Sequence, residues 1–248
     1  MPRLIPFRLV ATCALAFVLS LSLAAVAVAK GPVADLRVVD TGGSILAEDS
    51  FGATTASVKT SPKANCFGPG TGGSGKAVTV KGPTALGMLI QAARFTQKLK
   101  PLLITDAFDF GLGLCGVGGN VVNGKGSWYL KVNHKGATVG GDSLKVRAGD
   151  EVLWYLAPGF PYPDELWLQA PRRTMAGEPF SVRVFSYDEK GKRKPAAGVT
   201  VSGAQSPTGA DGRTTVVLAK PRRLIARDAG EIPSNRVAVC VGGKCPQG

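Results

Sequence analysis

Histidine is almost absent from this chain of 248 residues, which contains only one. A single histidine excludes a metal site built on two imidazoles and leaves few conventional catalytic triads. Charged residues are also sparse, at 19%. No apolar run after residue 29 is long and pure enough to span a membrane.

Glycine and proline, by contrast, are plentiful, with 33 and 17 copies. The chain is therefore expected to be rich in turns and poor in long helices with an apolar stripe. Hydrophobic residues make up 44%, which excludes an intrinsically disordered chain and suffices for one or two small cores. The 30 Lys+Arg exceed the 17 Asp+Glu to give a net charge of +13, and this favours anionic partners without naming one.

The first 29 residues read as an export signal. Arg3 and Arg8 make a cationic start, Leu9–Val28 is almost entirely apolar, and Ala27-Val28-Ala29 supplies small side chains before a cleavage site. We predict cleavage before Lys30; the alternatives are a cut after Ala27 and a retained membrane anchor. The prediction is a secreted, extracellular protein, free or held at the cell surface, with no transmembrane segment after cleavage.

Four cysteines remain beyond that signal, namely Cys66, Cys115, Cys240 and Cys245. An even number is typical of exported proteins with disulfides. Four cysteines allow three pairings, and we favour Cys66 with Cys115 and Cys240 with Cys245 because the two pairs lie far apart in sequence. Their spacing does not fit a zinc ribbon, so we predict no metal and no cofactor.

The segment Ala157–Pro163 divides the chain into two predicted domains. Its three prolines deny backbone donors and helical geometry to the segment. With residues 1–29 as the signal peptide, the first domain covers residues 30–160 and the second covers residues 161–248.

The first domain is predicted to contain one main helix. Pro83 suits a first helical position, Leu86, Leu89, Ile90 and Ala93 recur with helical spacing, and the run ends before the proline at position 101. Alternating side chains predict strands around it, so the expected fold is α+β and β-grasp-like. These strands are expected at residues 35–39, 53–60, 76–81, 127–133 and 150–156; the helix is followed by residues 106–110 and a glycine-rich crossing at 115–119.

Several of these motifs also carry a resemblance. An alternating strand, a Gly-Pro-Thr-Ala-Leu helix start at Gly82, a Ser-Trp-Tyr strand leading to Val132-Asn133 and an Ala-Gly-Asp-Glu-Val segment at Ala148 follow one another. Over residues 33–158 the chain resembles the transcobalamin-like C-terminal domain, a family of unknown function in exported bacterial proteins. In transcobalamins and intrinsic factor such a domain closes over cobalamin beside a helical barrel. This chain has no helical barrel, so cobalamin binding is not carried over.

The second domain shows strand-like stretches about every 10 to 15 residues with turns between them, the spacing of a small all-β sandwich. Thr208–Arg213, with its Asp-Gly turn, and Pro195–Val201 resemble bacterial Ig-like and carboxypeptidase-regulatory-like modules. The resemblance implies presentation rather than catalysis. The expected strands are residues 166–170, 180–187, 199–202, 214–219, 223–227 and 237–241.

Two sets of residues are candidates for binding. If Tyr129, Asn133 and Tyr155 share an exposed sheet face, they form a shallow platform for a sugar or planar ligand. On either strand, core packing is the alternative explanation for the aromatic residues.

The second set is a basic loop that attracts an anionic cell-envelope polymer if it meets the pairs Arg172-Arg173 and Arg222-Arg223 on one side. The alternative is a set of solvated turns that protect sheet edges. Nucleic acid is not expected, because interleaved aromatic residues are missing. The loop residues are Lys190, Lys192, Arg193 and Lys194.

Motifs that suggest catalysis are weak. Gly70–Ala77 has the spacing of a phosphate-binding loop, but Ala77 replaces the hydroxyl residue and a strand follows instead of a helix. His134 lies in Asn-His-Lys-Gly, a polar hairpin tip. The carboxylate pairs Asp106 with Asp109 and Asp150 with Glu151 lie at turns, where short spacing says little.

The sequence therefore predicts a secreted, non-enzymatic binding or surface-interaction protein whose ligand is unassigned. The alternative is an extracellular or envelope hydrolase. A deep polar pocket with converging carboxylates or His134 would favour the hydrolase, and a shallow aromatic face would favour binding. Oligomeric state is left open.

Overall fold

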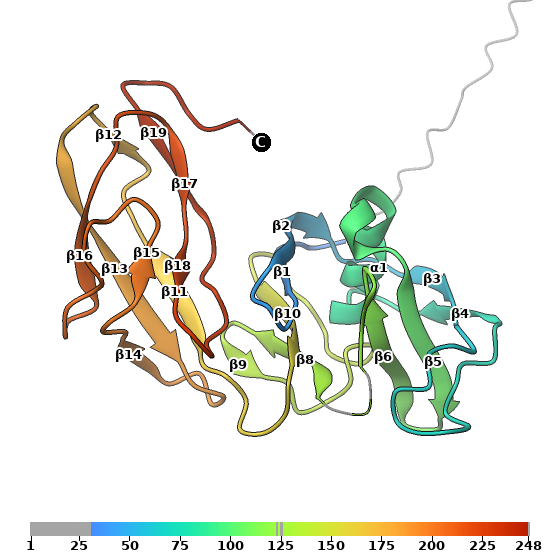
Figure 1. Ribbon diagram of the computed structural model, residues 1–248. Coiled ribbons are helices and arrows are strands. Elements are labelled where there is room, and N and C mark those ends of the chain that lie inside the picture. The colour runs from blue at the N-terminus through green and yellow to red at the C-terminus, as the bar shows by residue number, and fades with distance from the viewer. Residues whose placement is uncertain (1–30, 123, 125, 248) are drawn as a thin grey trace, which may run out of the picture.

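The computed structural model describes residues 31–122, 124 and 126–247. The predicted signal peptide, residues 1–29, lies outside the described residues. Two lobes lie side by side (Figure 1), and the described chain is mostly β-strand with a single α-helix. That helix has 11 residues, and none in the described part of the chain is long and apolar enough to cross a membrane.

A five-stranded sheet forms the centre of the first lobe, in the order β2-β1-β10-β8-β9. Strands β1 and β10 run parallel, and every other neighbouring pair is antiparallel. The strands are β1 (Val33–Val39), β2 (Ile45–Gly52), β8 (Ser127–Val132), β9 (Lys135–Gly136) and β10 (Glu151–Ala157).

The helix α1 (Ala85–Phe95) covers one face of this sheet. Thr84 caps it: the backbone there is extended, and the side chain accepts a hydrogen bond from the Gly87 amide at 3.1 Å. Pro83 therefore precedes the cap instead of occupying the first helical position. The four predicted apolar positions of the helix are buried in one core with Leu36, Val38 and Trp154 of the sheet.

Two small sheets complete the first lobe, namely β3 (Ala56–Lys59) with β4 (Ala77–Val80), and β5 (Leu102–Phe108), β6 (Gly111–Val117) and β7 (Asn120–Val121). A short 3-10 turn, Gln97–Leu99, follows the helix.

The β5-β6 hairpin corrects the sequence prediction of a glycine-rich crossing at residues 115–119, because residues 111–117 form strand β6. Glycine in β6 serves close packing: a Cβ on Gly113 would lie 2.7 Å from Cε2 of Phe67. The sequence analysis also did not predict β2, an acidic strand at the edge of the sheet.

The second lobe is all β. One sheet contains β11 (Glu165–Gln169), β13 (Pro179–Tyr187), β14 (Arg193–Pro195) and β16 (Arg213–Val217). Around it lie two smaller sheets that share a single apolar core with it. The smaller sheets are β12 (Arg173–Thr174), β19 (Val237–Val241) and β17 (Arg222–Leu224), and β15 (Thr200–Val201) with β18 (Ala226–Arg227).

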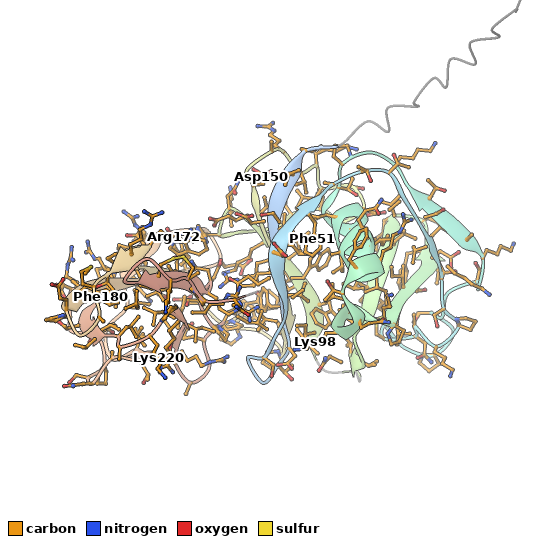
Figure 2. All side chains as sticks on the ribbon, turned by 90° about the horizontal axis from the view of Figure 1, so that it is seen from above. Phe51, Lys98, Asp150, Arg172, Phe180 and Lys220 are labelled. Carbon is orange, nitrogen blue, oxygen red and sulfur yellow. A yellow bond between two sulfur atoms is a disulfide. The ribbon has the colours of Figure 1, made fainter. Side chains whose placement is uncertain are left out.

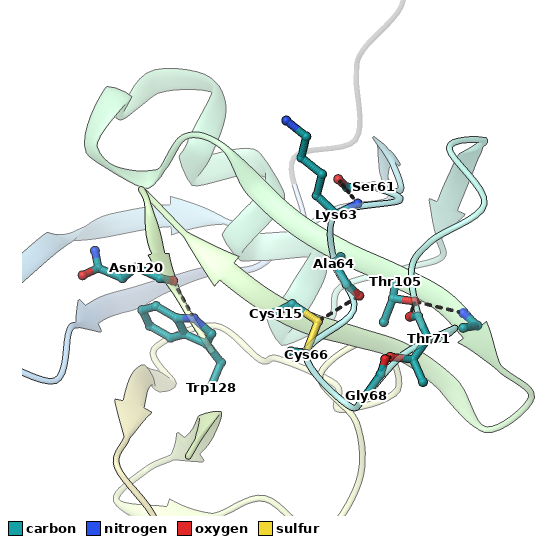
Figure 3. Close-up of a disulfide and its surroundings, with 11 residues drawn as sticks. Ser61, Lys63, Ala64, Cys66, Gly68, Thr71, Thr105, Cys115, Asn120 and Trp128 are labelled. Atoms are coloured by element: carbon teal, nitrogen blue, oxygen red, sulfur yellow. Dashed lines mark hydrogen bonds between the residues drawn. A yellow bond between two sulfur atoms is a disulfide. The ribbon is translucent and has the colours of Figure 1, made fainter. Parts of the chain in front are cut away.

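Both predicted disulfide pairings are confirmed. Cys66 bonds to Cys115 across a sequence separation of 49, and Cys240 bonds to Cys245 across a separation of 5. Figure 3 shows the first bond tying the loop that contains Gly68 to strand β6. Among the described residues the loop does not pair with β6 as a strand, so the disulfide holds it in place against that strand.

Loss of the Cys66–Cys115 bond is expected to destabilise the first lobe by about 4 kcal/mol, because a loop of that length regains its chain entropy on unfolding. The matched double variant Cys240→Ser/Cys245→Ser opens a far shorter loop and should cost only about 2 kcal/mol. Denaturant unfolding of both double serine variants checks the order. Equal losses would contradict it.

Candidate functional site

The sheet of the first lobe is buried on both faces. The face opposite α1 packs against the second lobe through a small apolar cluster that contains Val39, Leu153, Tyr155 and, from the second lobe, Ile232. Seen from above, side chains of the lobe that carries Phe51 meet side chains of the lobe that carries Arg172 (Figure 2). The lobes therefore share an interface, which we call the junction.

His134 lies at the centre of this junction. Asn133 and His134 have φ of 51° and 68°, the pair of left-handed residues that a tight two-residue hairpin turn between β8 and β9 requires. The imidazole stacks on Tyr187 at 3.8 Å between ring centroids and meets Trp167 edge-on at 4.8 Å. The prediction of a hairpin tip holds for the backbone, but the side chain is packed into the second lobe.

Two carboxylates, one from each lobe, flank the imidazole. Nε2 of His134 lies 3.1 Å from Oε2 of Glu151, and Nδ1 lies 3.2 Å from Oε1 of Glu165. Arg37 of β1 also pairs with Oε1 of Glu165 and donates to the carbonyl of Pro233 at 2.7 Å. We call these four side chains, Arg37, His134, Glu151 and Glu165, the junction network.

The charges of the junction network hold one another in the ionised state. Burial lowers the pKa of His134, but Glu151 and Glu165 outweigh it and raise the pKa to about 9. Burial raises the pKa of Glu165, but Arg37 and then His134 outweigh it and hold the pKa below its usual range. Arg37 and Glu165 are only 6% and 2% exposed, so each depends on its partner for compensation of its charge.

A second polar cluster lies beside the network. Lys131 is fully buried, lies 3.9 Å from Oε2 of Glu189, and points its ammonium at the carbonyls of Tyr187 and Asp188. Burial, reinforced by Glu189, raises the pKa of Tyr129 to about 12.

Two more arginines tie the lobes together at the edge of the junction. Arg236 donates to Glu48 through both its backbone amide and its Nε, each at 2.6 Å. Arg227 donates to the carbonyl of Gly43 at 2.6 Å.

A polar cleft of about 360 Å³ opens beside the network, lined in part by Glu151, Glu165 and His134. A histidine with a pKa near 9 is already protonated at neutral pH and cannot act as a general base. Both of its nitrogens face carboxylates. The arrangement is suited to holding the lobes together by charge.

The first lobe has a second concave site, an apolar groove of about 220 Å³ between the β5-β6 hairpin and strand β8. Phe67 and Phe110 on its lip are 55% and 84% exposed, while Trp128 and Trp154 in its floor are buried. Phe108 stacks on Phe110 at 4.9 Å and meets Phe67 edge-on at 5.2 Å. We call the site lined by these five residues the aromatic groove.

Glycine and hydrogen bonding shape the aromatic groove. A Cβ on Gly141 would lie 2.5 Å from Cη2 of Trp154, so only glycine leaves room for that ring. The indole nitrogen of Trp128 donates to the carbonyl of Asn120 at 3.2 Å (Figure 3). The indole nitrogen of Trp154 is buried and has no hydrogen-bond partner among the described residues.

The predicted platform of Tyr129, Asn133 and Tyr155 does not form an exposed face. Tyr155 is 2% exposed because this side of the sheet packs on the second lobe. The Asn133 side chain is engaged in the turn, donating to Asp150 and accepting from the Glu151 amide at 2.9 Å each. Tyr129 stacks on Tyr162 at 4.2 Å and also contributes to the lining of the aromatic groove.

The predicted basic loop does not act as one patch. Lys190 and Lys192 lie at an exposed turn closed by Asp188, which accepts from both of their amides. Arg193 and Lys194 are neighbours on a strand and therefore face opposite ways. Lys194 pairs with Asp164 at 3.1 Å.

Two of the other candidate carboxylates, Asp106 and Asp150, have structural partners. Asp106 accepts from the amide and the hydroxyl of Ser74 at 2.6 Å each, and these bonds lower its pKa. Asp150 accepts from the Arg147 amide in the turn before β10. In the described part of the chain, no group of three or more His, Cys, Asp or Glu side chains is placed to hold a metal ion.

Sequence reasoning missed Arg37 and Glu165 as functional residues. A signal was present, since each is a charge within an apolar strand, Leu-Arg-Val-Val and Glu-Leu-Trp-Leu. It also missed the aromatic groove, whose signal is the closely spaced pair Phe108 and Phe110 on a glycine-rich hairpin.

No family model, no curated protein and no solved structure matches this chain.

Raising the pH is expected to weaken the junction. Because the folded pKa of His134 is raised from 6.5 to about 9, its stabilising contribution is complete below pH 6.5 and is lost as the pH rises through about 9. The contribution is at most about 3 kcal/mol. Unfolding free energies of the wild type and His134→Gln, measured across this range, should converge at high pH, whereas parallel profiles would contradict the role of His134.

Arg37 and Glu165 are expected to be strongly coupled. Arg37→Leu or Glu165→Leu alone should cost about 3 to 5 kcal/mol by leaving a buried charge unpaired, and the double variant should cost less than the sum. A double-mutant cycle by urea unfolding measures this. The pair Arg236 and Glu48, whose side chains are 37% and 18% exposed, is the matched control and should couple by only about 1 kcal/mol; additive losses at Arg37 and Glu165 would be the contradictory result.

Proposed function

We propose that this chain is an exported, non-enzymatic binding protein that captures a small, ring-containing apolar ligand in the aromatic groove. The observation that supports this most is the pair of exposed rings, Phe67 and Phe110, on the lip of a groove floored by buried tryptophans. Exposed aromatic residues around a concave apolar site are typical of ligand recognition.

The size of the aromatic groove limits the ligand. An engineered apolar cavity of about 150 Å³ holds one benzene ring, so a groove of about 220 Å³ matches one or two fused rings. Trp154 lines the groove, and its indole nitrogen is buried without a partner among the described residues; the proposal assigns an acceptor atom of the ligand to this nitrogen, because a buried donor without a partner is costly. A ligand with one acceptor oxygen on an aromatic ring fits both features.

The proposal includes a finer assignment of the two lobes. Central parallel strands β1 and β10, flanked by β2 and β8, with one helix on one face, support a β-grasp-like module such as the transcobalamin-like C-terminal domain. Antiparallel strands around one apolar core support an Ig-like sandwich for the second lobe. Two disulfides support export to an oxidising compartment, with residues 1–29 as signal peptide.

The alternative function is a hydrolase. The polar cleft is the observation in its favour, because His134, Glu151 and Glu165 converge there. Hydrolysis by an acid–base pair needs groups that change protonation near neutral pH. The raised pKa of His134 and the lowered pKa of Glu165 keep both charged instead. This supports binding over hydrolysis.

The test uses 2-naphthol as probe, with tryptophan fluorescence and calorimetry as readouts. The double variant Phe67→Ala/Phe110→Ala should lose about tenfold to a hundredfold in affinity, because two ring contacts are removed. Phe95→Ala removes another exposed ring, 81% exposed at the end of α1, and is the matched control that should leave the affinity unchanged. Naphthalene, which lacks the hydroxyl, should bind more weakly than 2-naphthol.

Failure of both probes to bind the wild type would refute capture of such a ring ligand in the aromatic groove. An equal loss of affinity in Phe95→Ala would place binding elsewhere.

A further inference from the structure

The outer face of the β11-β13-β14-β16 sheet carries three arginines, Arg183, Arg193 and Arg213. Side chains alternate across this sheet, and Leu166, Val182, Val184 and Val216 point inward to the core. The residues that alternate with these inward-pointing positions along each strand therefore point outward. The outward set includes Gln169, Ser181, Arg183, Phe185, Arg193, Arg213 and Thr215.

Two arginines lie over one ring on this face, and a third stands beside them. The guanidinium carbons of Arg183 and Arg193 lie 4.7 and 4.5 Å from the centre of the Phe185 ring. Arg213 stands directly opposite Arg183 on the neighbouring strand. We call Arg183, Arg193 and Arg213 around Phe185 the arginine face.

The arginine face holds more positive charge than its surroundings neutralise. Like charges directly opposite one another on a sheet are unfavourable. Asp211 is the acid beside them, with Oδ2 3.7 Å from Nε of Arg213, while Nε of Arg183 donates to the Asp211 backbone carbonyl at 3.1 Å. Arg193 forms no ion pair and no side-chain hydrogen bond within the described residues, so an anion that bridges these arginines relieves the repulsion.

The guanidinium groups are also ordered in advance. Cation–π contact with Phe185, which is only 5% exposed, holds Arg183 and Arg193 over a fixed ring. Most of the side-chain entropy that binding would otherwise cost is therefore lost before a ligand arrives. A planar guanidinium presents paired donors that match the two oxygens of a carboxylate.

The neighbours of the arginines point to the class of polymer. Gln169, Ser181 and Thr215 are exposed on the same face and offer the amide and hydroxyl groups that bind sugar hydroxyls. No large exposed hydrophobic residue lies between these arginines in the described chain; the nearest in register, Val217, is at the far end of β16. We infer that the arginine face binds an acidic polysaccharide, with its carboxylates on the arginines and its hydroxyls on the flanking polar side chains.

The surface is independent of the aromatic groove, which belongs to the other lobe. It also differs from the predicted basic loop: it keeps Arg193, adds Arg183 and Arg213, and excludes Lys194, which lies on the opposite side of the strand and pairs with Asp164.

The experiment measures binding of the full chain to polygalacturonate, a uronic-acid polymer. Wild-type affinity should fall steeply as salt is raised. Arg183→Gln/Arg193→Gln should lose at least tenfold in affinity, equivalent to about 1.4 kcal/mol. The matched control Arg222→Gln/Arg223→Gln removes the same charge from exposed positions of β17 and should retain wild-type affinity.

Further variants and ligands separate the explanations. Arg213→Gln leaves the contacts over Phe185 intact and should still weaken binding several-fold, which keeps the test decisive if the double variant is unstable. Arg193→Lys keeps the charge but loses the paired donors and should bind less tightly than wild type. Binding of 2-naphthol should be unchanged in all of these variants, so failure here is distinct from failure of the proposed function.

Three outcomes would overturn the inference. The first is no binding to polygalacturonate at low salt. The second is an equal loss in the two double variants, which would reduce the effect to net charge. The third is binding to inorganic polyphosphate or to phosphatidylglycerol vesicles that is as tight as binding to polygalacturonate, which would assign the face to phosphate-bearing ligands.

Discussion

The buried ion pair of Arg37 and Glu165 is the constraint on which the relation of the two lobes depends. Each residue is a charge inside a strand and is almost fully buried, so its partner compensates most of its charge. Arg37 comes from the lobe with the helix and Glu165 from the all-β lobe, so the charge of each is compensated only while the lobes are together. His134 adds a second cation between Glu165 and Glu151 and extends the pair into a network.

This constraint explains why the central sheet has no free face. Helix α1 covers one side, and the junction covers the other. On an isolated module, the sheet face opposite the helix would expose Tyr129, Lys131 and Tyr155 to solvent. Here they meet the second lobe, and a fully buried lysine with carboxylate and carbonyl partners is the result.

With the sheet face occupied, the two surfaces proposed for recognition each belong to one lobe. The aromatic groove lies beside the helix of the first lobe, behind a loop that a disulfide fixes. The arginine face lies on the second lobe. A protein with a small-ligand groove in one module and a polymer-binding sheet in the other would hold its captured ligand at an acidic surface, and the junction would keep the two sites in fixed relation.

The sequence by itself determined the local features. Alternation and helical spacing identified the strands 127–133 and 150–156 and the buried face of α1, because these depend on neighbours along the chain. The wide separation of the two cysteine pairs identified both disulfides. Only the tertiary structure decided that Tyr155 is interfacial, that His134 is paired with two carboxylates, and that Arg193 joins Arg183 while Lys194 turns away. Those outcomes depend on which lobe meets which face and on strand register between distant segments, and a single sequence contains no record of such contacts. The glycines of β6 show the same division: the sequence predicted a glycine-rich crossing at 115–119, whereas Gly113 and Gly116 lie in a strand, where an added Cβ would meet the Phe67 ring at 2.7 Å and Leu103 at 3.0 Å.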